Sequence, residues 1–184
     1  MKKTLMALSF GLAASLAGTS ALANPGIINF EGVITNSTCP IDVVNPGDQS
    51  VGNLVKMVSV EASRFTAVGQ EYGGKDFILR VKGGSGCVLD PTKPNVAKVT
   101  FNGTTDASGD YFAVTPTTNG AKGVVIALRD QKGKLLSSGK ESDPYALFAD
   151  RPTDLKFDAT YRSTLAAVVG GPASAAIQFS VTVN

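Results

Sequence analysis

Two cysteines are the residues of this chain best suited to chemistry, and the reaction they suggest is oxidation to a disulfide. The 184-residue sequence contains Cys39, Cys87 and no histidine. In an exported chain, an even cysteine count favours a disulfide over two free buried thiols. Closing a loop of this length would contribute roughly 4 kcal/mol in the chain-entropy model. We therefore expect Cys39 and Cys87 to be bonded and to join two neighbouring strands.

Other residue combinations offer little for catalysis. Ser137 and Lys140 have the Ser-x-x-Lys spacing of some acyl-transfer enzymes, but that pattern works on a helix, and here Gly139 precedes the lysine in an apparent loop. Glycoside hydrolysis needs two carboxylates in one cleft, whereas the acidic residues here fall beside turn signals. The absence of histidine removes the commonest general base and metal ligand. We expect no enzyme activity, no cofactor and no metal site.

The first 23 residues have the pattern of a secretory signal peptide. Lys2 and Lys3 precede an apolar run over residues 5–16, and residues 21–23 form a small-x-small cleavage site. The run is too short to span a membrane, and no later segment reaches the 18 or so apolar residues that a span needs. We expect export without membrane insertion.

Removing this segment also removes the net charge. The 17 basic residues become 15 without Lys2 and Lys3, equal to the 15 acidic residues, so the formal charge falls from +2 to 0. No basic surface is left to attract nucleic acid. The remaining length of about 160 residues suits one domain, or one domain with an extension.

The elements of that domain are predicted to be strands. Apolar and polar residues alternate in short runs separated by Gly, Pro, Asn and Asp, and no segment keeps a helical period. Strand-like segments occupy residues 39–44, 51–60, 77–81, 96–101, 111–114, 123–128, 155–161 and 177–183. A short helical turn is predicted within residues 62–68, and Asn102-Gly103 predicts a turn. This spacing indicates an all-β sandwich or barrel.

Two alternating segments lie near the two ends of the chain. The inward set of the first is Ile28, Phe30, Gly32 and Ile34, and that of the last is Ile177, Phe179, Val181 and Val183. Both could pair within one closed sandwich. Alternatively, the first could bury its apolar face against another molecule. The alternation alone leaves both interpretations open.

These residues resemble a known family, the chaperone–usher pilins or type 1-like fimbrial subunits. The pattern Ile28-x-Phe30-x-Gly32-x-Ile34-x-Asn36-x-x-Cys39 is similar to their N-terminal extension and first strand, and Cys87 falls where they place the second disulfide cysteine. Residues 123–130 with Gly133, and residues 155–161, resemble two further strands of the family.

The C-terminal end resembles the family's β-zipper. Gly171, fourteenth from the C-terminus, takes the place of the zipper glycine, whereas Val183 replaces the usual penultimate tyrosine. The implied C-terminal zipper and groove edge comprise Gly171, Ile177, Phe179, Val181 and Val183.

The resemblance implies an incomplete immunoglobulin-like β-sandwich that is completed by a donor strand from a neighbouring subunit. It divides the chain into a signal peptide (residues 1–23), a donor-strand extension (24–36) and a pilin domain (37–184). The implied donor-strand residues are Ile28, Phe30, Gly32 and Ile34.

The resemblance also implies a function and partners. A periplasmic chaperone would first cover the open groove, and an outer-membrane usher would exchange it for the extension of an identical or related subunit, head to tail. The product would be a cell-surface fimbrium that supports adhesion, with this chain as the repeating shaft subunit. The alternatives are a minor or adaptor pilin and a monomeric secreted carbohydrate-binding β-sandwich; a hydrolase ranks below both.

Overall fold

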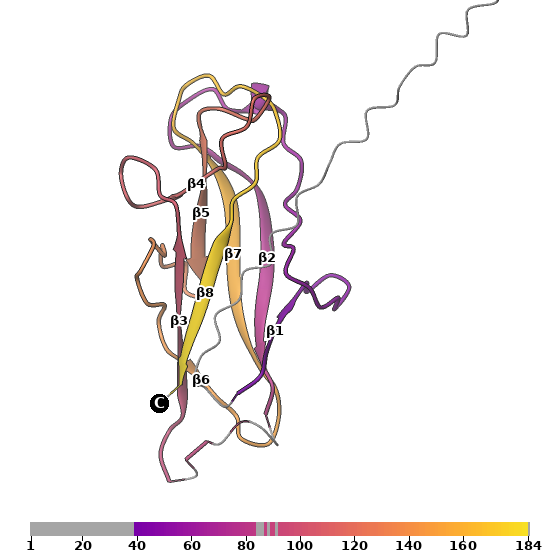
Figure 1. The fold of residues 1–184 in the computed structure, drawn as a ribbon, viewed down its shortest axis with the longest axis vertical. Helices are drawn as coiled ribbons and strands as arrows, with labels where there is room; N and C mark the ends of the chain where they lie inside the picture. The colour runs from indigo at the N-terminus through magenta and orange to yellow at the C-terminus, as the bar shows by residue number, and fades with distance from the viewer. Residues whose placement is uncertain (1–38, 84–86, 88, 91, 184) are drawn as a thin grey trace, which may run out of the picture.

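The computed structural model describes residues 39–83, 87, 89–90 and 92–183, so the predicted signal peptide and donor-strand extension lie outside the described residues. The chain folds into two packed β-sheets (Figure 1). Its elements are β1 (Ile41–Val44), the 3₁₀ helix η1 (Ala62–Arg64), β2 (Glu71–Val81), β3 (Val96–Gly103), β4 (Phe112–Ala113), β5 (Val124–Asp130), β6 (Tyr145–Ala146), β7 (Thr153–Ser163) and β8 (Ile177–Val183). The predicted all-β fold is confirmed.

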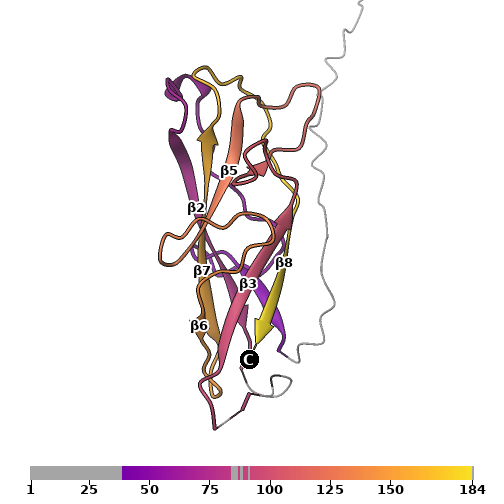
Figure 2. The ribbon, with the colours of Figure 1, turned by 90° about the vertical axis from the view of Figure 1, so that its left-hand side faces the viewer.

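Every strand pair is antiparallel. The larger sheet has the order β1-β2-β7-β5-β4, and the smaller has the order β6-β3-β8. Figure 2 shows β2, β7 and β5 in one layer and β3 with β8 in the other. Two of the six described strand pairs, β1-β2 and β4-β5, join strands that are consecutive in the sequence, whereas the other four, among them β2-β7 and β3-β8, do not.

An aromatic cluster joins the two sheets. Phe77 from β2, Phe101 from β3 and Phe157 from β7 are all buried, and their ring centroids lie between 5.0 and 6.1 Å apart. Edge-to-face and offset contacts at such distances are the favoured aromatic arrangements. Phenylalanines at inward positions of three strands thus fix how one sheet sits on the other.

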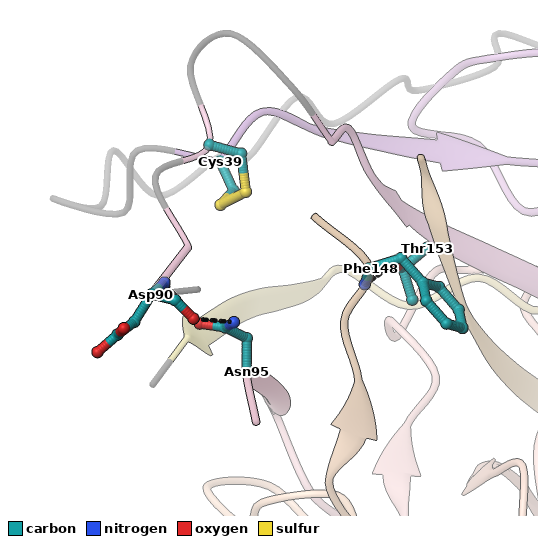
Figure 3. Close-up of a disulfide and its surroundings, with 6 residues drawn as sticks. Cys39, Asp90, Asn95, Phe148 and Thr153 are labelled. Carbon is teal, nitrogen blue, oxygen red and sulfur yellow. Dashed lines mark hydrogen bonds between the residues drawn. A yellow bond between two sulfur atoms is a disulfide. The ribbon is translucent and has the colours of Figure 1, made fainter. Parts of the chain in front are cut away.

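The predicted disulfide between Cys39 and Cys87 is confirmed (Figure 3). Cys39 stands just before β1, and Cys87 follows β2, whose Val81 pairs with Ile41. The bond therefore ties together the ends of two neighbouring strands, as predicted. These ends lie at the same end of the molecule as the C-terminal end of β8 (Figure 1).

Two local predictions were wrong. Asn102-Gly103 does not form a turn, because β3 continues through it and pairs with Gln178 and Ile177 of β8. Residues 51–60 do not form a strand: only Val51 makes an isolated bridge, to Val44. At Asn102-Gly103, pairing with a segment distant in the sequence overrides the local preference for a turn. Residues 52–60 have no partner strand among the described residues. The helical turn predicted within residues 62–68 is present as η1.

Candidate functional site

The last strand leaves one edge of its sheet open. β8 pairs with β3 through seven residues, from Gly103↔Ile177 to Ala97↔Val183. Among the strands that the structure describes, none pairs with the second edge of β8. A free strand edge presents backbone donors and acceptors to another chain.

An apolar groove of about 870 Å³ runs along this edge. One wall consists of Val51 and residues 53–57, and the other consists of residues 173–177 with Phe179, Ser180 and Val181. Its floor is built from core side chains of both sheets, among them Phe77, Leu79, Phe101, Ile126 and Leu128. The groove therefore exposes part of the hydrophobic core between the two sheets.

The β8 wall follows the predicted alternation. Val181 is buried, Ile177, Phe179 and Val183 are half-buried, and all four pack on the core, whereas Thr182 points outward and is exposed. Ile177, Phe179 and Val181 line the groove. Half-buried apolar side chains along an open sheet edge form a surface that a further strand can cover.

The opposite wall was not predicted as part of a site. Val55 and Met57 pack against the core from a segment without regular strand structure, while Val51 and Leu54 are more than 60% exposed. The sequence signal was the imperfect alternation of residues 51–60. That segment borders the groove without a partner strand among the described residues.

Gly171 lies in the loop before β8 rather than in the strand. A Cβ atom at this position would collide with the backbone of Asn119, Gly120 and Ala121. The loop is held there by the backbone N–H of Ala121, which donates to the carbonyl of Pro172 at 3.0 Å. This close approach explains why glycine is needed here, and the zipper role expected for Gly171 stays a prediction.

A smaller cavity of about 240 Å³ continues the groove near the start of β8. Met57, Tyr161 and Ala173 line both spaces. The Tyr161 hydroxyl donates a hydrogen bond to the Ala173 carbonyl at 3.0 Å, and burial raises the pKa of this phenol. Tyr161 thus anchors the groove wall of residues 173–177 to β7. The alternation of residues 155–161 was the sequence signal that placed its side chain inward.

The remaining candidates divide into two groups. Ile28, Phe30, Gly32 and Ile34 lie outside the described residues. Ser137 and Lys140 lie in a turn in which the Lys140 N–H donates to the Ser137 carbonyl at 3.1 Å, not on a helix. Within the described part of the chain, no helix is long and apolar enough to cross a membrane.

Comparisons with known proteins agree with this geometry. The sequence model of the fimbrial protein family matches residues 28–184. The chain is 31% identical to the "Probable major fimbrial subunit LpfA" of Escherichia coli O157:H7 over 185 residues, which covers 99% of this chain and 97% of the relative.

Solved structures show the same fold. A type I fimbria protein of Burkholderia pseudomallei is 35% identical, with a TM-score of 0.55 over 84% of this chain and 95% of its own. A chaperone–usher pilus structure is 20% identical, with a TM-score of 0.61 over 86% of this chain and 95% of its own. The resemblance to type 1-like pilins is confirmed: the chain belongs to the fimbrial protein family and is a structural subunit of a pilus.

Proposed function

We propose that this subunit polymerises when residues 24–36 of one copy insert into the groove of the next copy. The open groove beside β8 is the observation that carries the proposal. The apolar part of the extension, residues 28–34, has seven residues, and β8 also has seven. Two strands of equal length can pair along the whole open edge.

Insertion would supply hydrogen-bond partners for the backbone of β8 and would bury the apolar surface of the groove. The main chain of the extension would hydrogen-bond to the free edge of β8, and Ile28, Phe30 and Ile34 would cover the exposed core. Burying one such side chain contributes about 1.5–3 kcal/mol, so three contribute roughly 5–9 kcal/mol. Gly32 would occupy a position where another surface approaches closely.

The position of Cys39 supports one direction of insertion. Cys39, which follows the extension in the sequence, lies at the disulfide end, which is also the end where β8 stops. In a filament, each subunit must keep that end free for its own extension. The inserted extension therefore leaves the groove at the opposite end and runs antiparallel to β8. Such a head-to-tail contact does not close on itself, so it produces a filament.

The exposed groove implies that the subunit needs other proteins for its assembly. An uncovered apolar edge aggregates, so the subunit needs a temporary strand before polymerisation. We assign this role to a periplasmic chaperone, and the exchange for the next extension to an outer-membrane usher. The polymer would be a cell-surface fimbrium that supports adhesion. Similarity to a major fimbrial subunit over almost the whole length supports the role of shaft subunit.

Self-complementation tests the proposal. A copy of residues 24–36, joined behind Asn184 through a flexible linker, makes insertion intramolecular. This protein should be a soluble monomer by size-exclusion chromatography, whereas the unmodified mature chain should aggregate. A stable monomer of the unmodified mature chain would instead support the closed sandwich.

A pair of substitutions in the extension tests which face is inserted. Gly32→Leu should reduce the yield of filaments, since overpacking at a close contact costs about 1–3 kcal/mol. Secretion and disulfide formation should persist, because the extension is not part of its own domain's core. The control is Glu31→Ala, which changes the outward face and should leave assembly nearly unchanged. Equal yields from both variants would contradict the proposed register.

A further inference from the structure

Exposed large apolar side chains are confined to three places in the described part of the chain. Val51 and Leu54 lie on the groove wall. A second group, here called the apolar cap, lies at the end of the molecule where β2 begins and β7 ends, and it consists of Val58, Val68, Leu165 and Val169. Phe148 lies at the opposite end, before the start of β7. The filament contact proposed above explains only the first place.

The apolar cap is held in place by backbone hydrogen bonds. Next to Val68, the Gly69 N–H donates to the Ser163 carbonyl at 2.9 Å. Val169 and Lys122 exchange two backbone hydrogen bonds, at 3.0 and 3.1 Å. These bonds join the loops before β2, before β5 and after β7, so they present the cap as one surface.

The cap borders the exit of the groove. Val58 and Val169 line the smaller cavity, which shares Met57 and Tyr161 with the groove. An extension that runs antiparallel to β8 leaves the groove at this end. The body of the donating subunit must follow immediately beyond the cap.

The opposite end carries an aromatic knob, formed by Phe148 and Arg151. Phe148 is 43% exposed, and the Arg151 guanidinium carbon lies 3.8 Å from its ring centroid, a cation–π contact. The Phe148 N–H donates to the Thr153 hydroxyl at 3.0 Å (Figure 3). A Cβ atom on Gly83 would lie 2.7 Å from the Arg151 carbonyl oxygen, so this loop packs closely on the segment that leads to Cys87. The knob therefore lies at the disulfide end.

We propose that the aromatic knob of one subunit docks on the apolar cap of the next and stiffens the filament. This inference rests on the proposed insertion of residues 24–36. Only three residue steps separate Asn36, the end of the extension, from Cys39, and they span at most roughly 11 Å. The knob end of the donor and the cap end of the acceptor are therefore held close together. Burial of their apolar surfaces is favourable at this separation.

The contact is too small to hold two subunits by itself. Its apolar part consists of one aromatic and four aliphatic side chains. The inserted extension holds the aromatic knob of the donor near the apolar cap of the acceptor, so the effective concentration of the knob at the cap is high. Loss of the contact should therefore leave insertion intact and change only how the subunits are oriented to each other. This separates the contact from the proposed function in an experiment.

The test is a double-mutant cycle with Phe148→Ala and Leu165→Ala in the full chain, exported with its own assembly machinery. Filament yield reports insertion, and the persistence length in electron micrographs reports the end contact. Each single variant should give normal yield and at least a twofold shorter persistence length. The double variant should be no more flexible than either single variant, because both remove one side of the same contact. Gln131→Ala is the control, because Gln131 is exposed and follows Asp130, whose partner Phe157 lies within β7 rather than at either of its ends.

Three results would overturn the inference. These are an unchanged persistence length in the single variants, additive effects in the double variant, and loss of filaments in either single variant. Failure of the proposed function has a different signature, because the self-complemented protein would then not become a soluble monomer. Thermal unfolding of the self-complemented variants checks that both substitutions leave the domain folded.

Discussion

Replacing Phe179 with alanine measures how completely the groove is closed. Phe179 pairs with Phe101 across β3 and β8, packs on the core, and remains half-buried in the open groove. A fully buried phenylalanine costs about 3–5 kcal/mol when it is truncated to alanine. A half-buried one should cost on the order of half as much, about 2 kcal/mol. Closure of the groove should therefore add about 2 kcal/mol to the cost of Phe179→Ala. This corresponds to a roughly 30-fold loss of affinity for the inserted strand.

Guanidinium unfolding of the self-complemented monomer is the assay. Phe179→Ala should lower the free energy of unfolding by about 3–5 kcal/mol. Thr182→Ala is the control, since Thr182 lies on the same strand with its side chain exposed on the outer face, and it should change this free energy by less than about 0.5 kcal/mol. The difference between the two variants separates burial from strand propensity.

A loss of about 2 kcal/mol or less for Phe179→Ala would refute the reasoning, because the side chain would then be no better covered than in the open groove. A cycle that combines this variant with Phe30→Ala in the appended extension shows whether the two rings touch. Direct contact should give a coupling free energy of about 0.5–3 kcal/mol.

Three further predictions use the same monomer. Removing the disulfide with Cys39→Ser and Cys87→Ser should lower the free energy of unfolding by about 4 kcal/mol, as measured by guanidinium titration; a loss below about 1 kcal/mol would contradict the loop-entropy argument. Tyr161→Phe removes the hydrogen bond to the groove wall and should cost about 0.5–1.5 kcal/mol, whereas an unchanged melting temperature would show that the bond contributes nothing. Burial raises the pKa of Asp158, and the charge of Asp76 opposite it adds to the shift. The ionised carboxylate of Asp158 therefore destabilises the folded state at pH 7, so Asp158→Asn should stabilise the folded state by about 0.2–1 kcal/mol. This gain should vanish as the pH falls below about 3.8, because the wild-type carboxyl is then protonated in both the folded and the unfolded state. A gain that persists at pH 3 would point to another cause.

Several features of this protein could be predicted from the order of its residues. The alternation of Leu155, Phe157 and Ala159 predicted which face of β7 is buried, and the same pattern in residues 177–183 predicted the face of β8 that lines the groove. The disulfide was also predictable, because the signal peptide indicates an oxidising compartment and two cysteines allow only one pairing. The buried faces of β7 and β8 depend on residues that are neighbours in the chain, so they leave a periodic pattern in the sequence.

The open edge and its groove were decided only by tertiary structure. Val51 and residues 53–57 form a wall only because β8 lies across from them. Tyr161 anchors the opposite wall, residues 173–177, through the carbonyl of Ala173. Asn102-Gly103 is strand because β8 supplies its partners. Alternation indicates which face of a strand is apolar, but it does not indicate which other strand pairs with it. Strand order depends on pairing between segments far apart in the chain, and a strand left without a neighbour becomes visible only when all the others have been placed.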